Sequence, residues 1–231
     1  MNILECKSLT KKYGRVTALD EMDLTLESGR IVGLLGPNGS GKTTLIKIAN
    51  RLLQPTGGEL LIAGEKPSAD TKAMISYLPD RTYLPEWMKI NELLNMYEDF
   101  FGDFDSDKAK ELLQSLQIPE DKAMKKMSKG TKDKVQLILT MSRRAKIYLL
   151  DEPIAGVDPA ARDYILRTIL SNYSLDSLVL ISTHLIADVE AVLDEAVFLK
   201  QGKVLLHAPI DTIRQETGKS VDEYFREVFA C

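Results

Sequence analysis

The sequence predicts an α/β fold with a mainly parallel sheet, an N-terminal antiparallel β subdomain and an inserted α-helical subdomain. Three observations predict it. A glycine-rich loop lies between a short apolar run and a helical segment, residues 85–145 have helical periodicity, and short apolar runs return from residue 147. Continuous apolar runs that alternate with helices are typical of parallel strands buried on both faces.

The N-terminal segment is rich in strands. Strands are expected between residues 4 and 26, with a break at 13–14 and an end at 28–29, because Gly and Ser favour turns. A further short strand is expected at 60–62, after a glycine-rich turn. These strands form the predicted antiparallel subdomain.

Residues 36–43 form the loop GPNGSGKT, which matches the phosphate-binding pattern G-x-x-x-x-G-K-[ST]. The strand before it (31–35) and the helix after it (44–48) are the context that the pattern requires. Such a loop surrounds a polyphosphate with backbone N–H groups at the positive end of a helix dipole. A glycine-rich turn that binds nothing is the alternative, and the flanking elements count against it. We predict a P-loop NTPase core that binds a nucleotide through Gly36, Asn38, Gly39, Ser40, Gly41, Lys42, Thr43 and Thr44.

Two side chains of this loop have specific expected roles. Lys42 is expected to reach the β- and γ-phosphates. The Thr43 hydroxyl is expected to bind Mg²⁺.

The helical segment has two apolar faces, formed by Leu93, Leu94, Met96 and Tyr97 and by Leu112, Leu113 and Leu116. Residues 105–107, Asp-Ser-Asp, are a helix-start signal. We therefore expect a single domain, 1–231, in which residues 1–84 and 146–231 form the α/β core and residues 85–145 the helical subdomain.

Short apolar strands are expected at 147–150, 178–181 and 196–199. The first is followed by Asp151 and Glu152, at the carboxyl end of a strand, where α/β sheets bind ligands. Asp151 is expected to hold Mg²⁺, and Glu152 to accept a proton from an attacking water. A solvated strand end is the alternative for an isolated Asp-Glu pair, but the upstream P-loop favours a catalytic site.

The composition excludes several classes of protein. A net charge of −4 gives no reason to expect nucleic-acid binding. Cys6 and Cys231 lie at opposite ends, without the spacing of a disulfide framework or a metal site. Because the sequence has no signal-peptide pattern and no apolar stretch near the ~20 residues that cross a bilayer, we expect a chain that does not span a membrane.

With these motifs, the chain resembles the nucleotide-binding subunit of an ATP-binding cassette (ABC) transporter over essentially its whole length. The further matching pieces are Tyr13, residues 128–131, residues 155–158 and residues 182–184, in the family's order. The resemblance implies that Tyr13 stacks on the adenine of ATP, and that His184 contacts the γ-phosphate and orients the attacking water. The alternatives are a core aromatic at Tyr13 and a structural histidine at 184.

Residues 127–131, Met-Ser-Lys-Gly-Thr, resemble the family's signature segment, which is usually Leu-Ser-Gly-Gly-Gln. The resemblance implies that Ser128 and Gly130 contact the γ-phosphate of ATP bound by the opposite subunit. Lys129 departs from the pattern, and its charge either strengthens ATP binding or is solvated. A simple helix cap is the alternative for the segment.

Two other positions follow from the resemblance. Asp80 stands where the family usually has a glutamine that touches Mg²⁺, and as an anion it can coordinate the metal but cannot donate a hydrogen bond. Asp158 resembles the loop that crosses the dimer interface, although Asp158-Pro159 alone is a helix-start signal.

The implied function is that of an ATPase subunit that uses ATP and Mg²⁺. It pairs with a second ABC ATPase subunit, in a homodimer or heterodimer, and drives a separately encoded integral membrane permease from the cytoplasmic face. Bacterial exporters of antibiotics, peptides or lipids are the most similar subfamily. A soluble ABC ATPase without a permease and a regulatory module with little turnover are the alternatives.

The resemblance places the permease dock just after Asp80. Residues 81–88, RTYLPEWM, are apolar for a segment beside a catalytic loop and contain the single Trp of the chain. Exposed Trp87 and Met88 would suit a groove that holds a short partner helix. Packing of both side chains inside the helical subdomain is the alternative.

Overall fold

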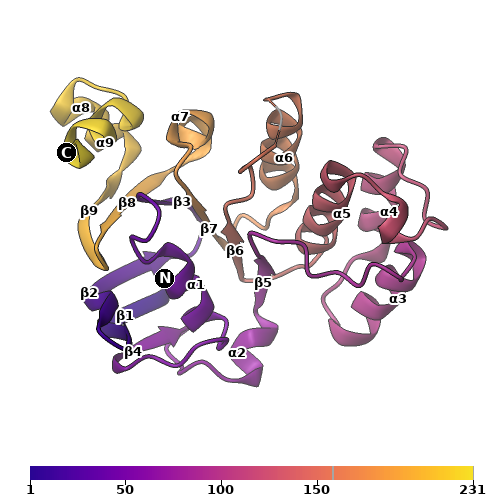
Figure 1. Ribbon diagram of the computed structural model, residues 1–231, viewed down its shortest axis with the longest axis horizontal. Coiled ribbons are helices and arrows are strands. Elements are labelled where there is room, and N and C mark those ends of the chain that lie inside the picture. Colours follow the sequence, from indigo (N-terminus) through magenta and orange to yellow (C-terminus); the bar gives the residue numbers. More distant parts are fainter. Residues whose placement is uncertain (158, 231) are drawn as a thin grey trace.

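The computed structural model describes the chain at residues 1–157 and 159–230, and the side chains of residues 159–161 are not described. This part of the chain contains a three-stranded sheet of order β2-β1-β4 and a six-stranded sheet of order β5-β6-β7-β3-β8-β9. Figure 1 shows the two sheets on one side of the molecule and a group of helices on the other.

The three-stranded sheet is antiparallel and consists of β1 (Asn2–Tyr13), β2 (Val16–Glu27) and β4 (Gly57–Ile62). β1 and β2 form a hairpin in which Tyr13 pairs with Val16. Gly14, with φ 59°, provides the left-handed residue that the turn requires. The predicted antiparallel subdomain is confirmed.

The six-stranded sheet is mainly parallel. Its strands are β3 (Arg30–Leu35), β5 (Ile75–Leu78), β6 (Ile147–Asp151), β7 (Leu178–Thr183), β8 (Glu195–Lys200) and β9 (Lys203–Pro209). Within the described residues, neighbouring strands of this sheet pair in parallel, except that β8 and β9 are antiparallel. The sequence predicts β3, β6, β7 and β8 as strands, and it does not identify β5 or β9.

The central strands are apolar on both faces. In β6, Leu149 belongs to the core cluster shared with the antiparallel sheet and Leu150 to the cluster on the opposite face, and Leu180 and Ile181 repeat this division in β7. Burial of such a side chain contributes about 1.5–3 kcal/mol relative to exposure. The two apolar clusters therefore stabilise the parallel sheet, and the predicted site lies at the carboxyl ends of its strands.

The helices cover the parallel sheet from both sides. On the first face, α1 (Lys42–Ala49) packs between the sheets, and the short α2 (Ala69–Ala73) precedes β5. On the second face lie α6 (Pro159–Asn172), α7 (Ile186–Val189) with the 3₁₀ turn η2 (Glu190–Val192), α8 (Ile210–Thr217) and α9 (Val221–Phe229).

The helical lobe comprises α3 (Ile90–Phe100), α4 (Ser106–Ser115), the 3₁₀ turn η1 (Met124–Lys126) and α5 (Lys129–Met141). These helices lie together beside β5 and β6 (Figure 1) and share a third core cluster. Leu93, Leu94, Tyr97 and Leu113 are buried in it, as the apolar faces predict. Asp105 caps α4 through a bond from the Lys108 amide (3.1 Å), so the predicted helix start is correct.

The segment 81–88 divides between surface and core. Trp87 is 71% exposed and Tyr83 is half-exposed, whereas Met88 is buried in the lobe cluster. An exposed Met88 is therefore a wrong expectation. The Met124 amide donates to the Met88 carbonyl (2.9 Å), and this bond holds the residue against η1.

Candidate active site

The P-loop connects the end of β3 to the start of α1. Gly39 (φ 81°) and Gly41 (φ 114°) have conformations that other residues rarely adopt. A Cβ atom on Gly41 would lie 2.5 Å from the Ala18 carbonyl oxygen in β2. The antiparallel sheet thus packs directly on the loop, and glycine is the residue that fits this contact.

The Lys42 ammonium lies over the loop. Its Nζ donates to the carbonyls of Gly36 (2.7 Å) and Pro37 (3.3 Å) and lies 3.6 Å from Glu152 Oε1. Burial lowers the pKa of Lys42, and the charges of Glu152 and Asp151 oppose this effect. A buried cation at the start of a helix suits a polyphosphate ligand.

Asp151 ends β6 with a fully buried carboxylate. Its Oδ1 accepts hydrogen bonds from the hydroxyls of Thr43 (3.2 Å) and Ser182 (2.5 Å), while Oδ2 is buried without a partner among the described residues. Burial raises the pKa of Asp151, the two hydroxyl bonds lower it, and the charges of Asp80 and Glu152 raise it. A buried acceptor without a partner costs about 1–3 kcal/mol, so Oδ2 fits the role of a cation ligand.

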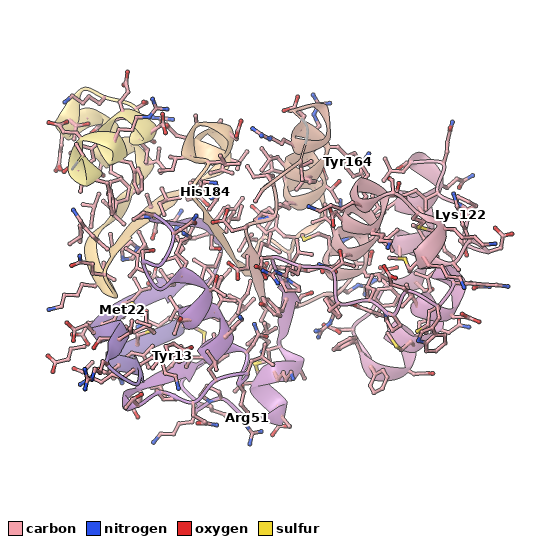
Figure 2. All side chains as sticks on the ribbon, in the orientation of Figure 1. Tyr13, Met22, Arg51, Lys122, Tyr164 and His184 are labelled. Carbon is pink, nitrogen blue, oxygen red and sulfur yellow. The ribbon has the colours of Figure 1, made fainter. Side chains whose placement is uncertain are left out.

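Glu152 and His184 face each other at the ends of two neighbouring strands. His184 Nδ1 lies 3.1 and 3.0 Å from the two Glu152 carboxylate oxygens. Glu152 has φ 52°, and its amide donates to the Ser182 carbonyl (2.9 Å). Left-handed non-glycine residues concentrate at functional sites. Figure 2 shows His184 close to α7, at the upper end of the sheet.

The geometry brings together five of the predicted site residues, namely Lys42, Thr43, Asp151, Glu152 and His184. The predictions gave Ser182 no role, yet it holds Asp151. Its position directly before Thr183 and His184, at the end of an apolar strand, indicates that it lies near the site, but the sequence does not indicate its bond to Asp151.

Comparison with known proteins identifies the family. The sequence profile described as "ABC transporter" matches residues 19–155, more than half of the chain. The chain belongs to the ABC transporter family. The resemblance drawn from the motifs is confirmed, and with it the ATP-binding and ATPase character of this ABC subunit.

Similar proteins cover nearly the whole chain. ABC transporter ATP-binding protein YtrB of Bacillus subtilis is 29% identical, over 93% of this chain and 74% of YtrB. Lipopolysaccharide export system ATP-binding protein LptB of Escherichia coli is 30% identical, over 96% of this chain and 97% of LptB. A solved structure described as the ATP binding subunit of an ABC transporter has a TM-score of 0.88 and 28% identity, covering 98% of this chain and 99% of that one.

The signature segment of this ABC subunit begins α5. The Ser128 hydroxyl caps the helix by accepting from the Thr131 amide (3.2 Å), which is the geometry of the cap alternative. Gly130 lies in the first helical turn, where N–H groups have no intrahelical partner. A γ-phosphate contact of Ser128 and Gly130 stays a prediction.

The exposed side chain of Lys129 makes no hydrogen bond or ion pair within the described chain. It lines a cavity of about 180 Å³ together with Asp80 and Glu152. The departure from the usual glycine therefore adds an available positive charge beside the predicted active site.

Tyr13 ends β1 and is 46% exposed, with Lys11 Nζ 5.2 Å from the ring centre. Figure 2 shows it on the three-stranded sheet. The core alternative is therefore wrong, and stacking on adenine stays a prediction.

Asp80 follows β5, its side chain is about half exposed, and it lies 3.9 Å from Arg81 Nε. Its charge contributes to the raised pKa of Asp151, and a metal-binding role for Asp80 stays a prediction. Asp158 lies outside the described residues.

None of the helices in the described part of the chain is both long and apolar enough to cross a membrane.

Proposed function

We propose that this ABC subunit hydrolyses ATP with Mg²⁺ in a dimer of two such subunits and thereby drives a separately encoded membrane permease of the exporter type. The observation that carries the proposal is the Lys42–Glu152–His184 cluster at the P-loop. It combines a cation for the phosphates with a carboxylate and an imidazole for the water.

The chain's own groups divide the reaction between them. Lys42 and the P-loop amides bind the phosphates of ATP and stabilise charge on the γ-phosphate in the transition state. The Glu152 carboxylate takes the proton of the attacking water, since it lies on the same side of the site as Lys42 Nζ. The His184 ring holds the Glu152 carboxylate in place and is near enough to orient the water or the γ-phosphate.

The residues present fit Mg²⁺. The unpartnered Asp151 Oδ2 and the Thr43 hydroxyl are hard oxygen ligands on neighbouring elements, and Asp80 adds a carboxylate nearby. When bound, the metal neutralises charge on the β- and γ-phosphate oxygens. Ser182 keeps Asp151 oriented for this role through its hydrogen bond to Oδ1.

The test is the substitution Glu152→Gln, which keeps the shape of the side chain and removes its basicity. We expect ATP affinity within about twofold of wild type and a fall of kcat by about 10²-fold or more, because general-base catalysis contributes about 10²–10⁴-fold. An ATP-bound dimer should accumulate in size-exclusion chromatography. Glu216→Gln, at an exposed position in α8, is the matched control. Undiminished phosphate release by Glu152→Gln removes this residue from the role.

A permease partner is supported by the surface beside the lobe. A cavity of about 530 Å³ is lined by the aromatic side chains of Tyr77, Tyr83, Tyr97 and Phe101, and also by Asp80. The size and apolar lining suit a short helix from a partner. Docking there would place this subunit on the cytoplasmic face of a membrane.

The exporter assignment is supported by relatives, since LptB is by its name a component of lipopolysaccharide export. Co-purification with the products of neighbouring genes separates a transporter subunit from a soluble ABC ATPase. A phosphate-release assay separates both from a regulatory module, which would bind ATP with little turnover.

A further inference from the structure

Glu152, the proposed general base, and its partner His184 lie on different loops. Glu152 begins the loop after β6, and His184 begins the short connection from β7 to α7. β6 and β7 are adjacent and parallel, and Asp151 is in register with Ser182. The strands fix the position at which each loop starts, but the orientation of the Glu152 and His184 side chains also depends on the position at which each loop ends.

The far ends of these loops meet at one guanidinium. Arg162, in the first half of α6, donates from Nε to the Val157 carbonyl (3.0 Å) and from Nη1 to Asp188 Oδ2 (2.7 Å). Val157 lies five residues after Glu152, and Asp188 lies in α7, four residues after His184. One side chain thus joins the end of the first loop to the helix that ends the second.

The contact is partly shielded from water and is directional. The Arg162 side chain is 26% exposed and that of Asp188 35%. Because a guanidinium is planar and its N–H groups have fixed directions, two donors on different edges hold their acceptors at a set separation. A lysine ammonium can make the ion pair but does not reproduce this fork.

We infer that Arg162 is a positioning residue that, through Val157 and Asp188, keeps Glu152 and His184 in register with each other. This inference rests on the proposed role of the Glu152–His184 pair. The P-loop connects β3 to α1, and within the described residues Arg162 makes no hydrogen bond or ion pair with either element, so nucleotide binding is separable from positioning.

The experiment compares Arg162→Ala, Arg162→Lys and Asp188→Asn in steady-state ATP hydrolysis. We expect Arg162→Ala to lower kcat by about tenfold, as loss of a supporting contact does, with KM for ATP and affinity for a fluorescent ATP analogue within about twofold. Arg162→Lys should recover part of kcat. The Arg162→Ala, Asp188→Asn double variant should be little worse than Arg162→Ala alone, because both changes break the same link.

Arg167→Ala is the matched control, since Arg167 is an exposed arginine on the same helix that makes no hydrogen bond or ion pair in the described part of the chain. It should leave kcat unchanged. Hydrogen exchange adds a readout independent of activity. Arg162→Ala should speed exchange at the Ala155, Val157 and Leu185 amides together, and Arg167→Ala at none of them.

Three results overturn the inference. They are a wild-type kcat in Arg162→Ala, a loss of kcat accompanied by an equal loss of ATP affinity, or unchanged exchange in the two loops. Glu152→Gln is run in parallel. If it turns over normally, or if the wild type does not hydrolyse ATP, the proposed function fails and the inference fails with it. If Glu152→Gln is inactive while Arg162→Ala is normal, the inference alone fails.

Discussion

Asp151 carries an electrostatic cost that is built into the site. Its carboxylate is fully buried, and one of its oxygens has no hydrogen-bond partner in the described chain. Because burial raises its pKa above the ordinary 3.8, the folded state binds this proton more tightly than the unfolded state. Its contribution to stability is therefore fully present below the ordinary pKa and is lost as the pH rises through the raised pKa.

Asp151→Asn removes this cost at neutral pH. We expect its Tm to exceed that of wild type by about 2–4 °C at pH 7 without nucleotide, which corresponds to about 1 kcal/mol in a chain of this size. The difference should shrink as the pH falls through the raised pKa of Asp151, while ATPase activity is lost at every pH. Thermal denaturation scans at several pH values measure this. A Tm below that of wild type at pH 7 contradicts it.

Asp80 is expected to act on the metal rather than on the nucleotide. Its charge helps to raise the pKa of Asp151, and its side chain is about half exposed. Asp80→Asn should raise the Mg²⁺ concentration for half-maximal hydrolysis by about tenfold, in the range found for residues that support a metal site, with ATP affinity nearly unchanged. Mg²⁺ titrations of ATP hydrolysis and of ATP binding measure this. Identical curves for variant and wild type would indicate that Asp80 is a surface residue without a role at the metal.

Single residues differ in how far the sequence predicts them. Lys42 and Thr43 are predictable because the loop pattern fixes both their identity and their surroundings. Ser182 is not, because its bond to Asp151 depends on the register of β6 and β7, two strands that are distant in the sequence. The contact between Glu152 and His184 is non-local in the same way.

Elements are predictable where their burial pattern is uniform. β6 and β7 are buried at every position and read directly as apolar runs. β9 alternates between exposed and half-buried residues at the edge of the sheet, so it has no such run, and β5 is only four residues long. The sequence also does not separate Trp87 from Met88, because the backbone turn that sends one outward and the other inward is fixed by contacts with η1.

The segment 81–88 contributes Tyr83 to the cavity proposed as the dock, and the exposed Trp87 of the same segment offers a test of docking there. Trp87 is 71% exposed and Met88 is buried, so the two neighbours form a matched pair. Trp87→Ala should leave Tm within about 2 °C and basal ATPase near normal while abolishing co-purification with the permease, since interface aromatics often contribute 2 kcal/mol or more. Met88→Ala should instead lower Tm, because truncation of a buried Met to Ala costs about 2–5 kcal/mol. Intact co-purification of Trp87→Ala contradicts docking at this segment.

The whole molecule depends on how the lobe is joined to the α/β core. Arg143, just after α5, is 4% exposed and binds both parts. On the core side it donates to the carbonyls of Ala73 (2.5 Å) and Ile75 (2.6 Å), which flank the start of β5. On the lobe side it pairs with Asp103 (2.9 Å) and lies 4.0 Å from the centre of the Phe101 ring. The same guanidinium thus orients the lobe relative to the strand that leads to Asp80.

Arg143→Ala should uncouple the two parts. Removal of one partner of a buried charge pair costs about 3–5 kcal/mol, and at about 2–4 °C per kcal/mol we expect Tm to fall by about 10 °C. The lobe has its own core cluster, so calorimetry should show a broadened or split transition in place of one cooperative step.

The neighbouring Arg144 is the control, because its pair with Asp105 is on the surface (2.8 Å, 77% exposed arginine) and such pairs contribute about 0–1 kcal/mol. Arg144→Ala should unfold like wild type. If Arg143→Ala also unfolds in one step at the wild-type Tm, the joint between lobe and core lies in the packed side chains around α5 and not in this guanidinium.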